Sequence, residues 1–538
     1  MLGTRTGLDA GILGTSVRAA CAAACACSLT AAHAVDLSPS EDIAVRWDNT
    51  VKYSDGYRLQ NPRDELVSNI NLDDGDRNFR RGLMSNRFDL LSEFDAQSHG
   101  FGLRVSGAAW YDTVYNQSTD NDSAATTNNV SQPYDRFTHG TRDMAGRRAE
   151  ILDAFVFGKV DLDESRRLSL RLGQYSMLWG NSLFFAANGI AKGMAPVDVY
   201  KLDIPGAQSK ETLLPVKQAS ATLNLSDTTS VEAYYQFKFR PTRLAPAGSY
   251  FSATDWMGDG GESFLFAPGY GVDRGADITG RHKANIGFAL NTHSELLKTD
   301  FGFYALRYQD TSPQTVMQPA IGQYFLAYPQ DVRTFGVSFA RLLGDANVSG
   351  EISERWGQPL WASNSANVIG SPADNAADLD LSNNSLWPTA RTLHFNVSTV
   401  WIMPTSQWWG GATLIGEFMA NKVLGYEHNA GNIDPTRHRS SAAARLIFSP
   451  TYYQVASGLD LSPSVNAGWA FRGDSMIDGG ALPFAGSPDH GGDVVLGLDA
   501  VWRTKYSFNV SWTNYLGHAN TQSFLDRDYI RFSMQTTF

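Results

Sequence analysis

The sequence has few cysteines, with 3 in 538 residues. All of them, Cys21, Cys25 and Cys27, lie near the amino terminus, inside a segment that looks removable. The remainder of the chain therefore has no thiol, which excludes disulfides and thiolate metal sites from the mature protein.

That first segment has the pattern of an export signal. Arg5 and Arg18 precede an apolar, alanine-rich stretch, and Ala32-His33-Ala34 has the small-x-small pattern that signal peptidase accepts. A lipoprotein signal at Cys21 is the weaker alternative, because the apolar run follows this cysteine instead of preceding it. We predict a signal peptide over residues 1–34 and a single mature unit over residues 35–538.

Long hydrophobic runs are also missing. After Ala34 no stretch of about 18 apolar residues occurs, so the sequence predicts no transmembrane helix. Only helices and closed barrels satisfy all backbone hydrogen bonds within a bilayer. With 43% hydrophobic residues, 12% aromatics, 49 glycines and a mean hydropathy of -0.26, the composition is typical of strands that are apolar on one side only.

Basic residues are in the minority, with 44 Lys and Arg against 55 Asp and Glu and a formal net charge of -11. A nucleic-acid partner is excluded by this balance, because phosphates demand a basic surface. The sequence contains neither the GxSxG pattern of a nucleophile elbow nor an HExxH helix. We therefore predict no enzyme activity and no cofactor. An outer-membrane hydrolase stays open as a third hypothesis, since catalytic triads are defined in space.

Period-two alternation is the dominant pattern that is present. Leu393, Phe395 and Val397 alternate with His394 and Asn396, and many segments repeat this pattern. The pattern predicts an all-β fold, a transmembrane antiparallel β-barrel of about 18 strands, with 16 as the alternative. The predicted strands are 43–53, 86–95, 101–114, 149–160, 166–175, 216–225, 230–239, 283–292, 299–309, 331–341, 346–355, 390–401, 411–419, 440–453, 459–472, 492–502, 505–514 and 527–538.

The connections between these segments alternate between short and long. Short turns such as Leu342–Asp345 and Arg503-Thr504 separate long loops such as 116–148, 176–215 and 240–282. Short periplasmic turns and long extracellular loops are typical of bacterial outer-membrane barrels, whereas a soluble β-sandwich or propeller gives no reason for this alternation.

The last strand ends on an aromatic residue, Phe538. A terminal aromatic on such a strand resembles the signal that the barrel-assembly machinery reads on outer-membrane proteins. We therefore predict Phe538 as the assembly signal, the bacterial outer membrane as the location, and outer-membrane lipid and lipopolysaccharide as the surroundings.

Two stretches resemble conserved blocks of the DUF1302 family of proteobacterial outer-membrane barrels: RLGQYSMLWGNSLFFAANGIAKGMAPVDVYKLDIPGAQSKETLLPV from Arg171 to Val216, and VEAYYQFKFRPTRLAPAGSYFSATDWMGDGG from Val231 to Gly261. The first block departs from the family pattern at Gly189-Ile190-Ala191, where members often have Asn-Ile-Asn. The resemblance implies a barrel of unassigned function. It also implies two possible partners, a periplasmic lipoprotein and a transporter of the resistance-nodulation-division (RND) type.

The first of these blocks predicts a loop that folds into the lumen. Its apolar side chains are too numerous for an exposed loop, and the barrel mouth is the nearest place to bury them. One hypothesis is a substrate or constriction site in which aromatic residues form an apolar entry and polar residues add contacts. The alternative is that the aromatic residues only pin the loop to the wall. The candidate residues are Trp179, Phe184, Phe185, Asn188, Lys210 and Glu211.

Strand parity also predicts which charged residues face the lumen. Both signs are present without a single-sign ladder, so a network of ion pairs stiffening the wall and a substrate-guiding path are both open. The candidates are Arg46, Glu232, Lys238, Arg445, Arg503 and Arg531, with Lys52, Glu417, Arg472 and Asp499 on the same face.

Two further charge clusters give weaker predictions. Asp73, Asp74 and Asp76 lack the spacing and terminal glutamate of an EF-hand, so we predict no metal site there. Arg80, Arg81 and Arg87 could contact lipopolysaccharide phosphates, but solvated loop charge is the favoured explanation.

The leading functional hypothesis is an outer-membrane channel or transporter for hydrophobic or amphipathic small molecules. The second hypothesis is a non-transporting barrel that serves as a structural or docking platform for a periplasmic lipoprotein or an RND-type pump.

Overall fold

The structure, a computed structural model, describes residues 35–40, 42–202, 204, 209–281, 285–363, 366–382, 384–477 and 488–538. The predicted signal peptide, 1–34, lies outside the described residues.

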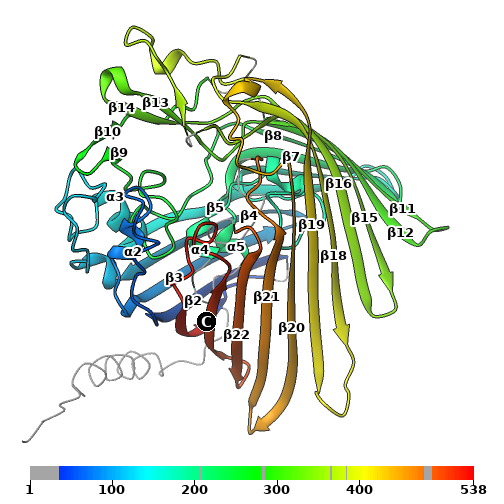
Figure 1. Ribbon diagram of the computed structural model, residues 1–538. Helices are drawn as coiled ribbons and strands as arrows, with labels where there is room; N and C mark the ends of the chain where they lie inside the picture. The colour runs from blue at the N-terminus through cyan, green and yellow to red at the C-terminus, as the bar shows by residue number, and fades with distance from the viewer. Residues whose placement is uncertain are drawn as a thin grey trace, which may run out of the picture.

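The described chain forms a closed antiparallel barrel of 18 strands (Figure 1). Each predicted segment corresponds to one barrel strand, so the predicted number and order are confirmed. The strands are β2 (Ile43–Arg58), β3 (Gly82–Ser98), β4 (Phe101–Asp112), β5 (Arg147–Asp161), β6 (Arg167–Tyr175), β7 (Val216–Asn224), β8 (Thr229–Gln236), β11 (Asn285–Ser294), β12 (Thr299–Tyr308), β15 (Val332–Leu343), β16 (Ala346–Pro359), β18 (Thr389–Met403), β19 (Gly411–His428), β20 (Ser440–Ala456), β21 (Leu459–Arg472), β22 (Gly491–Trp502), β23 (Tyr506–Leu516) and β24 (Tyr529–Thr537).

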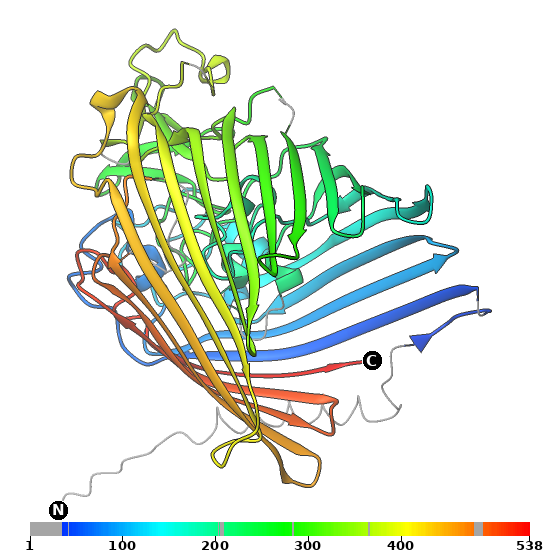
Figure 2. The same ribbon diagram turned by 90° about the vertical axis from the view of Figure 1, so that its right-hand side faces the viewer.

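The first and last barrel strands close the sheet. Strand β24 pairs antiparallel with β2, from Thr50 opposite Thr537 to Arg58 opposite Tyr529, and Figure 2 shows the two strands side by side. The Phe538 backbone continues the pairing through reciprocal hydrogen bonds with Asn49 at 2.7 and 2.8 Å. A short extra strand, β1 (Val35–Asp36), pairs with β2. Closure leaves no unpaired edge in the barrel.

The outer surface is apolar and the inner surface is polar, as the alternation predicts. On β18, Phe395 is exposed on the outside, whereas His394, Asn396 and Ser398 are buried inside. Closed antiparallel barrels with an apolar outer band are the β structures that span the bacterial outer membrane, and this chain is one of them. Among the described helices, none is both long and apolar enough to cross a membrane.

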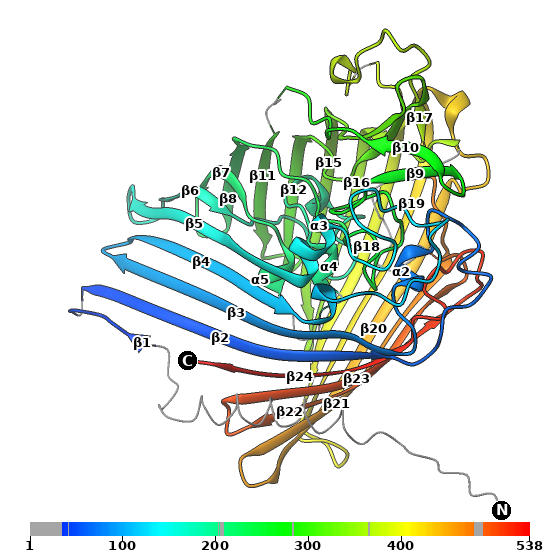
Figure 3. The same cartoon turned by 90° about the vertical axis from the view of Figure 1, so that its left-hand side faces the viewer.

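The long loops contain a second, smaller sheet that the sequence analysis did not predict. Its order is β17-β13-β14-β10-β9, and Figure 3 shows β9, β10 and β17 at the end of the barrel away from the short turns. The strands come from three different loops: β9 (Ser263–Ala267), β10 (Tyr270–Arg274), β13 (Gln314–Gln318), β14 (Gln323–Ala327) and β17 (Asn367–Val368).

The long loops also carry short helices and pack into the extracellular half of the lumen. Phe79, Tyr115 and Tyr250, from three loops, join the inward-facing wall residues Trp110 and Tyr529 in one buried cluster. The loop helices are α2 (Asp74–Arg77), η1 (Val114–Asn116), α3 (His139–Thr141), η2 (Arg142–Gly146), η3 (Ile190–Gly193), α4 (Val199–Leu202), α5 (Ser209–Thr212), η4 (Pro319–Ile321), η6 (Ala376–Asp378) and η7 (Ala430–Asn432). The loops and the barrel wall therefore share one hydrophobic core.

The seam between β2 and β24 is held by buried ion pairs. Asp76 of α2 accepts hydrogen bonds from Arg58 at 2.9 Å and from Arg527 at 2.9 and 3.0 Å. Arg58 also lies 3.0 Å from Asp526. Two guanidinium groups thus surround the Asp76 carboxylate.

Candidate functional site

The inward loop, residues 176–215, connects β6 to β7 and reaches across the lumen to strands on the other side. Its middle section contacts β16, β18 and β19, which lie more than 150 positions later in the chain. The predicted loop limits agree with the end of β6 at Tyr175 and the start of β7 at Val216.

A glutamate of the wall holds one turn of the inward loop. Buried Glu417 on β19 accepts backbone N–H bonds from Leu183 at 3.0 Å and Phe185 at 3.1 Å, and from Phe184 between them. Its second oxygen accepts a bond from the Ser182 hydroxyl at 2.8 Å. Three successive amides converge on one carboxylate oxygen, an arrangement that binds an anion through charge-assisted hydrogen bonds.

A second glutamate repeats this arrangement on β16. Glu351 accepts backbone bonds from Asn181 at 2.7 Å and Ile190 at 2.9 Å. Glycine is required on both sides, because a Cβ at Gly180 or Gly189 would lie 2.2 Å from a Glu351 oxygen. Arg355, four residues further along β16, donates to the carbonyls of Ala187 and Gly189 at 3.2 and 2.7 Å.

Asn188 is the most completely bonded of the predicted loop residues. Its amide nitrogen donates to Asn396 at 2.8 Å and to two wall carbonyls at 3.2 Å. Its side-chain oxygen accepts from Asn421 at 3.1 Å and lies 2.9 Å from the Nδ1 atom of His394. These contacts account for all the bonding capacity of the Asn188 side chain.

The predicted aromatic residues lie against the wall. Trp179 packs on Tyr234 and Tyr304 with ring centroids 5.1 and 5.9 Å apart, and its indole N–H donates to Glu232 at 3.0 Å. Phe185 is buried in a cluster with Met419, Ala443 and Ala470, and Phe184 packs against that cluster while partly buried. Contact of these rings with a substrate stays a prediction.

The two remaining loop candidates lie in α5. Glu211 is buried, and Lys210 occupies the neighbouring position in the helix. Burial lowers the pKa of the nearby Lys201 ammonium, and the charges of Asp198 and Glu211 oppose that shift. Glu211 is therefore one of the acidic groups that favour the charged form of Lys201 at the base of the inward loop.

Some of the charged residues predicted to face the lumen have polar partners on the inner wall, and two others lie beyond the ends of their strands. Arg46 pairs with Asp48 at 2.6 Å, Arg445 with Asp493 at 2.5 Å, and Arg531 donates to Ser511 at 2.8 Å. Glu232, besides its Trp179 contact, accepts from Asn291 at 2.8 Å. These inner-wall contacts resemble the stiffening network that the sequence left as one alternative.

Two of the predicted lumen residues lie beyond the strand ends, and their lumen-facing direction stays a prediction. Lys238 follows the end of β8 at Gln236, and Arg503 lies in the turn after β22 with φ +53°. Both side chains are exposed, and the Arg503 guanidinium lies 4.6 Å from the Trp502 ring centroid. Strand parity does not extend into a turn, so it could not give the direction of either residue.

The predicted lipopolysaccharide cluster also separates. Arg87 is buried against Asp89 at 2.7 Å and lies over the Trp110 ring, whereas Arg80 is exposed near Asp122. Arg87 is thus a wall residue and not a surface phosphate contact.

A group of buried carboxylates joins three loops. Asp255 accepts the backbone N–H of Asp74 at 3.2 Å, while the Asp74 side chain accepts from Asn121 at 3.0 Å and from the Asn128 backbone at 2.9 Å. Burial raises the pKa of Asp74 to about 7 and raises the pKa of Asp255 well above its ordinary value. Among the described residues, no group of three or more acidic, histidine or cysteine side chains has a metal-binding arrangement.

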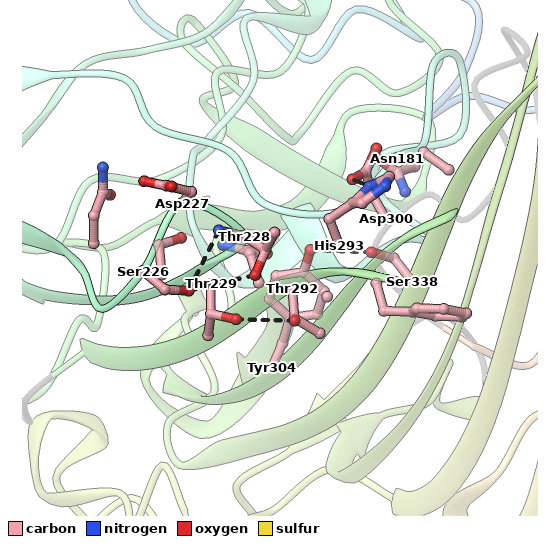
Figure 4. Close-up of a pocket in the computed structure, with 16 residues that line it drawn as sticks. Asn181, Ser226, Asp227, Thr228, Thr229, Thr292, His293, Asp300, Tyr304 and Ser338 are labelled. Atoms are coloured by element: carbon pink, nitrogen blue, oxygen red, sulfur yellow. Dashed lines mark hydrogen bonds and ion pairs between the residues drawn. The ribbon is translucent and has the colours of Figure 1, made fainter. Parts of the chain in front are cut away.

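On the periplasmic side of the inward loop lies a cavity of about 380 Å³ that the sequence analysis missed. Its wall comes from β7, β8, β11, β12 and β15, and Asn181 of the inward loop also lines it (Figure 4). His293 and Asp300 face each other across the β11–β12 hairpin with Nδ1 and Oδ1 2.7 Å apart. The only sequence signal was a series of small polar residues on the inner faces of these strands.

Comparisons with known proteins give one family match and a set of similar solved structures. The model of the family described as "Protein of unknown function (DUF1302)" matches residues 15–538. No curated protein matches the chain. Similar solved structures include OccAB1 of Acinetobacter baumannii, with 10% identity, a TM-score of 0.42 and coverage of 94% of this chain and 98% of that one. A BenF-like porin from Pseudomonas fluorescens Pf-5 has 9% identity, a TM-score of 0.41 and coverage of 93% and 98%.

Proposed function

Because this chain belongs to the DUF1302 family, whose description assigns no function, we propose one from the barrel itself: a channel or transporter for hydrophobic or amphipathic small molecules in the outer membrane. The observation that carries the proposal is the inward loop. It crosses the lumen and is bonded to the opposite wall by Glu351 and Glu417. A barrel that served only as a scaffold would not need a bonded constriction at this depth.

The apolar residues around the loop support the hydrophobic part of the proposal. Trp179, Ile190 and Met194 form one buried cluster with Tyr304 and Tyr308 of the wall. Displacement of the loop would expose this surface to the lumen, where it could receive an apolar molecule. The mechanism is passive: capture at the loop, then diffusion to the periplasmic side.

The second candidate, a docking or structural barrel, is favoured by one specific observation. Large apolar side chains are exposed at the short turns, including Leu296 at 92% and Trp408 at 67%. Such side chains suit either the membrane interface or a periplasmic lipoprotein or RND-type partner.

The hydrolase hypothesis has the weakest support. The His293–Asp300 pair is the kind of dyad a hydrolase uses, but its free nitrogen, Nε2, lies 3.9 Å from the Glu295 carboxylate instead of facing a hydroxyl.

Replacing residues 181–190 with a Gly/Ser segment of equal length separates the first two candidates. If the protein transports, whole cells should take up a small hydrophobic fluorescent probe faster, or with less selectivity, than cells with the native barrel. A docking barrel should show unchanged permeability. The matched control replaces Ser371–Asp374 in the β16–β18 loop, whose side chains are mostly exposed.

A further inference from the structure

The cavity on the periplasmic side of the inward loop is lined by two carboxylates and by no lysine or arginine among the described residues. Sixteen residues line it, among them Asp227 and Asp300, and none of these described residues is a lysine or arginine. The rest of its lining consists of hydroxyl and amide side chains, His293, Tyr304 and the apolar residues Phe301, Gly302 and Ala340 (Figure 4). Asp300 shares one oxygen with His293, whose Nδ1 atom lies 2.7 Å away, and the exposed Asp227 has no lysine or arginine beside it in the lining. The two carboxylates make a field that attracts cations and repels anions.

The cavity is built by specific contacts instead of being a gap between turns. The Tyr304 hydroxyl lies 3.0 Å from the Ser338 hydroxyl. The same hydroxyl lies close to Gly302, where an added Cβ would be only 2.0 Å from the Tyr304 oxygen. On the other side, the His293 backbone N–H donates to the Thr228 carbonyl at 2.9 Å. These hydrogen bonds hold Tyr304 on one side of the cavity and the hairpin that carries Asp300 on the other.

The position of the cavity connects it to the inward loop. Asn181 lines the cavity and donates to the Phe339 carbonyl at 3.0 Å, while its backbone N–H bonds to Glu351. Next to the cavity, Asn291 links to Glu232, which holds Trp179. A molecule in this space therefore lies directly below the constriction, on the periplasmic side.

We propose that this cavity is a binding site for a small organic cation of the substituted-ammonium class. Asp227 and Asp300 neutralise the positive charge, the Tyr304 ring contacts the alkyl or aryl part, and the hydroxyls and amides replace water around it. Its volume of about 380 Å³ falls within the range of small-molecule pockets. Any role in transport rests on the proposed channel function, while the binding itself does not.

Isothermal titration calorimetry on the full-length protein, purified in a non-ionic detergent, tests the site. The probe is benzyltrimethylammonium, compared with benzoate as an anion of similar size and sorbitol as a neutral polyol. We expect saturable binding of the ammonium ion only. Stronger binding of benzoate or sorbitol, or no binding of the ammonium ion, would overturn the assignment.

Charge-removing variants locate the binding. Asp227→Asn combined with Asp300→Asn should weaken ammonium binding about tenfold or more, because both attractive charges are lost. Asp345→Asn, an exposed acid in the β15–β16 turn outside the cavity lining, is the matched control and should bind normally. Equal affinity in the double variant would show that the ion binds elsewhere.

A single variant distinguishes loss of binding from loss of folding. Asp300 contacts His293, so its replacement could disturb the hairpin; Asp227→Asn alone changes an exposed turn residue and should still lower affinity measurably. Conductance of the same preparations is measured separately. Ammonium binding without conductance would contradict the channel proposal alone, and conductance without ammonium binding would contradict the cavity proposal alone.

Discussion

At the residue scale, the polar inner wall is used mainly to hold a loop. Glu351, Arg355, Asn396 and Glu417 each direct their bonds to the inward loop. Parity alone places Glu417 on the inner face, but no sequence pattern indicates that its partner is the backbone of a segment about 230 residues earlier. Backbone amides leave no signature in a sequence, which is why these anchors were missed.

A single substitution should release the loop. In Glu417→Gln, the new NH₂ group cannot accept bonds, so some of the Leu183, Phe184 and Phe185 amides lose their acceptor. Each buried donor left without a partner costs about 1–3 kcal/mol. We expect hydrogen–deuterium exchange at residues 183–185 to become about tenfold faster or more.

The control for this prediction is Glu427→Gln. Glu427 is exposed and accepts a backbone bond from Gly357 at 2.7 Å, away from the inward loop. Unchanged exchange at residues 183–185 in the Glu417 variant would show that the aromatic contacts, and not the carboxylate, hold the loop.

At the scale of elements, the barrel strands were predictable and the loop sheet was not. Alternation over eight or more residues is imposed by the lipid on one side and the lumen on the other, so it is visible locally in segments such as β18 and β23. The small five-stranded sheet and the loops packed with it in the lumen are called the cap below. Its strands β9, β10, β13 and β14 have 5 residues each and pair within the cap. Burial on both faces, as in β13, removes the alternation.

The carboxylates that join the loops should make the cap sensitive to pH. Because the pKa of Asp74 is raised to about 7, the folded cap binds this proton more tightly than the unfolded chain does. The stabilisation is complete below about pH 4 and is lost as the pH rises towards 7. Proteolysis of the extracellular loops should therefore be slower at pH 5 than at pH 8, after correction for protease activity.

Asp74→Asn should reduce this pH dependence, because the side chain no longer titrates. The comparison is Asp259→Asn, an exposed acid in the same loop as Asp255, which should leave the profile as it is. Identical profiles in all three proteins would contradict the prediction.

At the scale of the whole molecule, the first and the last barrel strands meet in one seam. Pairing of Phe538 with Asn49 places the terminal aromatic residue beside the first barrel strand. Phe538→Ala should therefore lower the amount of assembled barrel, measured as the heat-modifiable form on gels of outer-membrane fractions. Tyr453→Ala, at an exposed site near a short turn, is the control; equal barrel levels in both variants would argue against the assembly signal.

The same seam also bears on the order in which the barrel and its loop core form. The cap core needs Phe524 and Tyr529 from the carboxyl-terminal hairpin together with Phe79 from the first loop, and Asp76 needs Arg527. We expect these partners to meet only when β24 pairs with β2 and closes the barrel. A barrel that has not yet closed would therefore lack this part of the loop core, and we expect its loops to fill the lumen only in the last step of assembly.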